Sequence, residues 1–164
     1  NDGTIYQTID MQQGCWHAGS ERANRASVGV EISNAYYPKY QEWYIRNGHG
    51  ERPLLEGERC HGEELDPFMG FYPVQIQALK QLWKAISKGL NIPYEAPLNQ
   101  FGNTATKYVQ DVKYGDFRGF ASHYHISKRK IDCAGLDIRA LLEECKEEDE
   151  SGYTYASVIC EDDS

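Results

Sequence analysis

The stretch from residue 73 to 90 constrains the fold most, because its pattern fits only an amphipathic helix. Its apolar residues recur at spacings of three and four, and so share one helical face: Ile76, Leu79, Leu82, Ile86 and Leu90, with Trp83 alongside. Pro73 suits the first turn, and Gly89, followed by Asn91 and Pro93, marks the end. We predict that this helix packs into the core and carries no chemistry, and that shorter helices form over 40–46 and 136–144.

Residues 27–32, Ser-Val-Gly-Val-Glu-Ile, alternate as a β-strand does. Valines 28 and 30 and Ile32 point to one face, and Glu31 points to the other. Glu31 is either an exposed strand glutamate or a general base, and we favour the base because Gly29 leaves room beside it. The sequence predicts another strand over 4–9.

A second stretch places metal-binding side chains close together in the sequence. The apolar residues 119–121 are read as a strand that leads into His123 and His125, which would lie on the same side of it. The basic run 128–130 follows, then Asp132 and Cys133. Histidine, carboxylate and thiolate all bind zinc, and a catalytic zinc needs three protein ligands plus water. The spacing alone equally fits a surface loop with a solvated basic run.

Two ordered groups of residues together resemble the type-2 N-acetylmuramoyl-L-alanine amidases, which are relatives of the peptidoglycan recognition proteins. The first group is Trp16-His17-Ala18-Gly19, then Asn24, then the strand 27–32. The second group is a histidine followed by Lys130-Ile131-Asp132. The resemblance runs from about residue 2 to 138. It implies an α/β fold with a mixed central β-sheet flanked by helices. It also implies zinc-dependent hydrolysis of the amide between N-acetylmuramic acid and L-alanine.

The same resemblance suggests a role for each matching residue. Glu31 would activate water, and Lys130 would stabilise the oxyanion. His123 and Asp132 would bind zinc, with His125 and Cys133 as the alternative pair, because both registers are close to that of the family. Three residues near the cleft would contact the substrate: His17, Arg22 and Asn24.

This sequence departs from the family pattern in two places. The first zinc histidine of the family has no counterpart, so we expect a chain that lacks the family's N-terminal strand and helix and holds zinc poorly. Residues 34–72 read as a large insertion over the cleft, rich in aromatic residues and containing His49 and His61, each read as a surface histidine. The amidase-like domain would span 1–144, and 145–164 would be an acidic tail or linker.

The charge distribution excludes some classes of partner. The net charge is −8, and residues 141–164 account for all of it with nine acids and one lysine. The remainder is neutral, which argues against nucleic-acid binding. No apolar run reaches the roughly 18 residues of a membrane span. The five cysteines are scattered, which favours reduced thiols over a disulfide framework.

Peptidoglycan or a muropeptide is the expected partner, zinc the expected cofactor, and a monomer the expected state. The resemblance favours a phage lysis enzyme, an endolysin, or a bacterial enzyme of cell wall degradation, and leaves its location open. Two other functions remain: a peptidoglycan-binding module of the same fold without catalysis, and a zinc hydrolase of another amide. Glu31, Lys130 and Asp132 together favour catalysis, since a binding module needs none of them.

Overall fold

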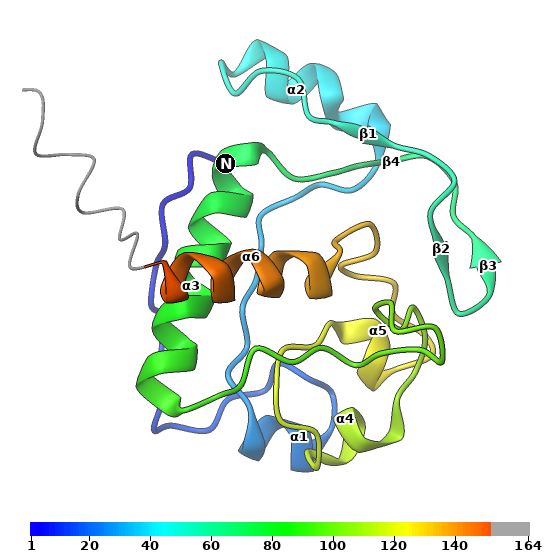
Figure 1. Cartoon of the computed structure of the whole chain (residues 1–164). Coiled ribbons are helices and arrows are strands. Elements are labelled where there is room, and N and C mark those ends of the chain that lie inside the picture. The colour runs from blue at the N-terminus through cyan, green and yellow to red at the C-terminus, as the bar shows by residue number, and fades with distance from the viewer. Residues whose placement is uncertain (152–164) are drawn as a thin grey trace, which may run out of the picture.

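The computed structural model describes residues 1–151 and consists of helices with two very small sheets (Figure 1). The helices are α1 (Glu21–Ala26), α2 (Gln41–Arg46), α3 (Pro73–Leu90), α4 (Gln110–Tyr114), α5 (His123–Ile126) and α6 (Ile138–Glu150), and a 3-10 turn, η1, covers Pro38–Tyr40. The strands are β1 (Leu54–Leu55), β2 (Arg59–Cys60), β3 (Glu63–Glu64) and β4 (Phe68–Met69). No helix in this part of the chain is long and apolar enough to cross a membrane.

The predicted helix 73–90 is confirmed as α3, with the same first and last residues. The Gln75 side chain accepts a hydrogen bond from the Tyr72 N–H at 3.1 Å, which stabilises the first turn. The helix stops at Asn91, whose φ of 52° is left-handed. The buried face of α3 packs in the main core with residues of α6 and the loops between them: Leu79, Trp83, Ile86, Ala96, Phe120, Leu136, Ile138 and Leu142.

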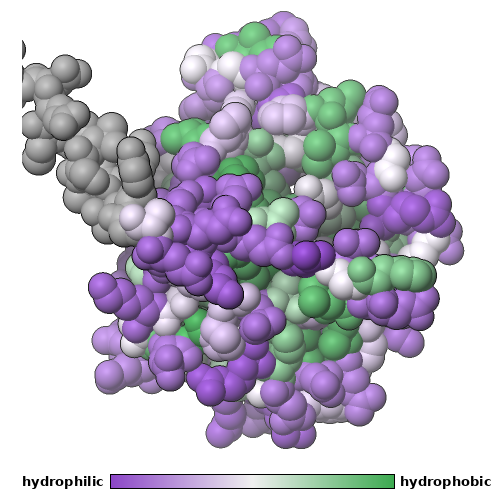
Figure 2. Space-filling model, viewed as in Figure 1, coloured by the Kyte–Doolittle hydropathy of each residue, from purple (hydrophilic) through white to green (hydrophobic). Residues whose placement is uncertain are grey.

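Helix α6 crosses α3 and extends the predicted helix 136–144 as far as Glu150 (Figure 1). Its acidic residues pair with lysines of α3: Lys80 Nζ lies 2.8 Å from Glu144 and 2.5 Å from Glu148. Lys84 Nζ lies 3.2 Å from Asp149. Acidic side chains therefore form part of the α3–α6 interface, and a hydrophilic band covers α6 on the surface (Figure 2). Residues 152–164 of the predicted tail lie outside the described residues.

The expected central β-sheet is not formed within residues 1–151. The strands predicted over 4–9 and 27–32 are extended segments, and no backbone–backbone hydrogen bond involves residues 28–32 in the described chain. Val28 and Val30 are exposed instead of buried against a neighbouring layer. Alternation gave the correct extended conformation, but a strand also needs a paired neighbour. The fold is therefore mixed, with helices and small sheets.

The histidine segment also differs from the prediction, because His123 and His125 lie on helix α5 and not on a strand. Two residues two positions apart point to nearly opposite sides of a helix. His123 is accordingly half-buried, whereas His125 is completely buried.

The insertion 34–72 contains the predicted short helix as α2, together with all four strands. Strand β1 pairs antiparallel with β4, and β2 pairs antiparallel with β3. In Figure 1, η1 and α2 lie at one end of the molecule, and the β2–β3 hairpin reaches down the side toward α5. The extended segment 27–33 runs through the middle, from α1 toward the insertion.

Candidate functional site

His123 and Asp132 come together at the N-terminus of α5. The Nδ1 atom of His123 lies 2.9 Å from Asp132 Oδ2. Ser122, the residue before the helix, holds the two segments together, because its hydroxyl donates to the Asp132 carbonyl at 2.6 Å and accepts from the Cys133 N–H. The side chains of His123 and Asp132 are 23% and 55% exposed, so solvent reaches both.

This pair fits zinc in the type of its donors and in their proximity. Ligands about 2.0 Å from a tetrahedral zinc lie about 3.3 Å apart, so two atoms at 2.9 Å are close enough to share one ion. However, no group of three or more histidine, cysteine, aspartate or glutamate side chains in residues 1–151 could hold a metal. A catalytic zinc needs three protein ligands, and the described residues bring only two such donors together here, His123 and Asp132.

The alternative pair, His125 and Cys133, has a different environment. His125 Nε2 donates to the Ala105 carbonyl at 2.6 Å, and Nδ1 accepts from the Ser122 N–H at 2.9 Å, so both ring nitrogens are occupied. Burial raises the pKa of the Cys133 thiol to about 11, with a further contribution from the charge of Asp132. The geometry thus favours His123 and Asp132 over this pair.

The burial of His125 predicts a stability that falls with acid. Burial lowers the pKa of His125 to about 4, from an ordinary value of 6.5. Between these two values the unfolded chain binds a proton that the folded chain excludes, so acidification favours unfolding. We expect this group alone to lower the free energy of unfolding by about 2 kcal/mol between pH 7 and pH 5. NMR titration of the His125 ring, beside urea unfolding at both pH values, measures this, and protonation near pH 6 in the folded protein would contradict it.

Glu31 is exposed on the segment between α1 and the insertion. Its negative charge also contributes to the raised pKa of Cys133, after burial and Asp132, so the glutamate lies within electrostatic reach of this loop. The neighbouring Ile32 and the Cys133 side chain pack against the same core cluster. Segments about a hundred residues apart in the sequence are thereby brought to one region.

The space beside Gly29, predicted to lie open next to Glu31, is filled by the His17 ring. A Cβ added at Gly29 would lie 2.6 Å from His17 Cγ, which no side chain could accommodate without movement. Gly29 therefore makes room for the His17 ring and not for a substrate beside Glu31. The His17 ring is also fixed by hydrogen bonding, since Nε2 lies 2.9 Å from Ser27 Oγ and Nδ1 lies 3.1 Å from the Cys15 carbonyl.

Asn24 and Arg22, the other predicted substrate contacts, are already engaged with the protein. Asn24 is buried, and its Oδ1 accepts from the N–H groups of His17 at 3.0 Å and Ala18 at 2.7 Å. Asn24 therefore stabilises the backbone of the Trp-His-Ala-Gly turn through these two hydrogen bonds. Arg22 is exposed on α1, where it lies 3.4 Å from Asp116 and 5.5 Å from the Tyr114 ring centre.

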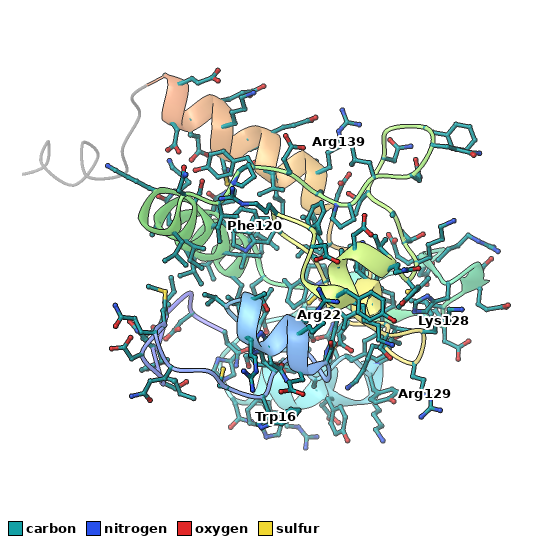
Figure 3. The ribbon with its side chains drawn as sticks, turned by 90° about the horizontal axis from the view of Figure 1, so that it is seen from below. Trp16, Arg22, Phe120, Lys128, Arg129 and Arg139 are labelled. Carbon is teal, nitrogen blue, oxygen red and sulfur yellow. The ribbon has the colours of Figure 1, made fainter. Side chains whose placement is uncertain are left out.

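The basic run lies on the surface directly after α5. Lys128 and Arg129 project outward beside this helix (Figure 3). Lys130 is also exposed, and its carbonyl accepts a hydrogen bond from His61 Nε2 at 2.8 Å. No sequence pattern predicts this contact, because His61 lies 69 residues away in the insertion and has no partner at a metal-ligand spacing. Ser122 was likewise missed, since the partners of its hydroxyl, the Asp132 carbonyl and the Cys133 N–H, lie 10 and 11 residues away in the sequence.

Comparison with known proteins identifies the family of the chain. A family model described as N-acetylmuramoyl-L-alanine amidase matches residues 1–134, which include every residue of the candidate site. No curated protein and no solved structure shows significant similarity to the chain. The chain therefore belongs to the type-2 N-acetylmuramoyl-L-alanine amidase family.

Proposed function

We propose that this protein hydrolyses the amide between the lactyl group of N-acetylmuramic acid and L-alanine, in peptidoglycan or in muropeptides. The observation that carries the proposal is the His123–Asp132 pair, with Nδ1 and Oδ2 at 2.9 Å, in a chain of the amidase family. Glu31 lies within electrostatic reach of the adjoining Cys133, which supports a common site.

Each residue has a role that follows from its chemistry. Glu31, as the general base, takes a proton from the attacking water and passes it to the amine that leaves when the C–N bond breaks. Lys130, an exposed ammonium two residues before Asp132, stabilises the negative oxygen of the tetrahedral intermediate. His123 and Asp132 would contribute two ligands to zinc. When bound, zinc lowers the pKa of its water to about 7 and polarises the carbonyl.

A peptidoglycan-binding module without catalysis is the second candidate. It is supported by the incomplete ligand set, because residues 1–151 offer only two neighbouring donors. Hydrolysis of a different amide by the same residues is the third candidate.

Digestion of purified peptidoglycan by the full-length protein distinguishes the three. We expect new L-alanine amino termini and intact lactyl-muramic acid, detected by mass spectrometry, and loss of both on adding a chelator. Sedimentation with the cell wall but no new amino termini would identify a binding module. New termini at another residue would identify a different amidase.

Zinc binding tests the metal site independently of activity. We expect Asp132→Ala to weaken zinc binding at least tenfold in calorimetric titration, because it removes one of the two donors. Asp111→Ala is the matched control, since Asp111 is exposed in the first turn of α4 and has no part in the pair. Equal zinc affinity in both variants would exclude Asp132 as a ligand.

A further inference from the structure

The turn between β2 and β3 brings an imidazole from the insertion to the loop that carries Lys130. The His61 N–H donates to the Thr106 carbonyl at 2.7 Å, which fixes the turn against the body of the protein. The ring nitrogen Nε2 lies 2.8 Å from the Lys130 carbonyl. Because a carbonyl oxygen can only accept, Nε2 carries the hydrogen and donates it to Lys130.

The packing beneath the turn sets the position of this imidazole. Cys60, the preceding residue, is buried in a cluster with Phe68, Tyr124 and Ala134. Ile131, the residue after Lys130, packs against the same cluster. The hairpin and the Lys130 loop therefore rest on shared side chains, and movement of one relative to the other would disturb this packing.

Apart from the bond to His61, the Lys130 backbone makes one hydrogen bond within the described residues. Its N–H donates to the Ser127 carbonyl at 3.2 Å, a contact within the same loop. Among residues 1–151, His61 is the only side chain that hydrogen-bonds to the Lys130 backbone. Without His61, the Lys130 backbone would keep only its local hydrogen bond to Ser127 among the described residues.

We propose that His61 is a positioning residue that holds the Lys130 backbone and thereby sets the Lys130 ammonium relative to the His123–Asp132 pair. This inference rests on the proposed function in assigning a catalytic task to Lys130. It gives the insertion a defined role: its β2–β3 hairpin supplies the His61 side chain that hydrogen-bonds to the Lys130 backbone.

Three variants separate positioning from a general effect on the fold. His61→Ala removes the donor, whereas His61→Gln keeps an N–H that can reach a carbonyl. His49→Ala is the matched control, because His49 belongs to the same insertion but stacks on Trp43, with ring centres 5.7 Å apart. All three should keep thermal midpoints within about 3 °C of the parent protein.

We expect His61→Ala to lower kcat about tenfold with KM unchanged, as for other residues that orient a catalytic group. His61→Gln should restore most of this loss, and His49→Ala should match the parent. Parental kcat in His61→Ala, or a glutamine variant no better than the alanine variant, would overturn the proposal.

Backbone NMR keeps this test separate from the test of the amidase reaction. The amide resonances of Ile131 and Asp132 should shift in His61→Ala and return toward the parent positions in His61→Gln. Unchanged resonances would refute the positioning role whatever the activity. Shifted resonances in a parent protein without amidase activity would uphold the contact and refute the assigned reaction.

Discussion

Glu31→Gln is expected to lower amidase turnover by about 10²- to 10⁴-fold, the usual contribution of a general base. Glutamine has nearly the same shape as glutamate but cannot take a proton from water at neutral pH. The side chain is exposed on a segment without ladder hydrogen bonds, so the substitution leaves no buried group unpaired. Release of L-alanine amino termini from purified peptidoglycan measures the effect.

The control for this variant is Glu143→Gln, which neutralises another exposed glutamate on the outer face of α6. Glu143 lies 2.8 Å from Arg139 in an i,i+4 pair, and such surface pairs contribute only about 0.3–0.5 kcal/mol. The control should therefore keep full turnover and a parental unfolding curve. A Glu31→Gln protein with parental turnover would remove Glu31 from the mechanism.

Arg52→Met is expected to have the largest effect on stability, lowering the free energy of unfolding by about 3 kcal/mol or more. Arg52 is only 1% exposed, and its guanidinium lies between the rings of Tyr44 and Tyr72, 4.3 Å and 4.2 Å from their centres. Its Nη1 donates to the Gly70 carbonyl at 3.1 Å and to Gln75 Oε1 at 3.0 Å. Methionine fills much of the volume but takes this donor from the Gly70 carbonyl and leaves Gln75 Oε1 with only the Tyr72 N–H.

Arg52 also fixes the end of the Glu31 segment. Its Nη2 donates to the Ser33 carbonyl at 3.0 Å, and Gln75 Nε2 donates to the same oxygen at 2.8 Å. Because residues 28–32 make no backbone–backbone hydrogen bond in the described chain, these contacts are a main anchor of the segment after Glu31.

Urea unfolding of Arg52→Met beside Arg59→Met tests this expectation. Arg59 belongs to the same insertion but is exposed, 3.6 Å from an equally exposed Glu64, so its loss should cost less than about 1 kcal/mol. Equal unfolding free energies for the two variants would show that the buried guanidinium is not an anchor.

The sequence predicted local structure well where one residue pattern decides it. Helix α3 follows from the apolar spacing within it, together with Pro73 at its start and Asn91 past its end. The strands failed because pairing depends on a partner elsewhere in the chain, and alternation at 27–32 carries no information about that partner. Helix α5 was missed because it has four residues, too few for a periodic pattern.

The candidate site was predictable only where its residues lie close together in the sequence. His123 and Asp132 are nine residues apart, and the structure places them in direct contact. The choice against His125 needed knowledge of burial, since both of its ring nitrogens bond to backbone groups of segments that the sequence does not connect. The roles of Gly29, Asn24 and His61 each depend on a neighbour that only the fold supplies. The assignments to catalysis and zinc remain predictions.

The lysines of α3 form ion pairs with α6, whereas the Arg52 guanidinium contacts uncharged groups of α3 and the insertion. The two sets of contacts therefore respond differently to acid. Hydrogen bonds from Lys80 and Lys84 lower the pKa of Glu148, so its contribution persists until strong acid protonates the carboxylate. Buried Lys80, which also pairs with Glu144, would then lose one of its two carboxylate partners, and the α3–α6 interface would weaken. The partners of Arg52 are carbonyl and amide oxygens and aromatic rings, none of which gains a proton in that range. Strong acid would therefore weaken the ion pairs between α3 and α6 while leaving the contacts of Arg52 with α3 and the insertion unchanged.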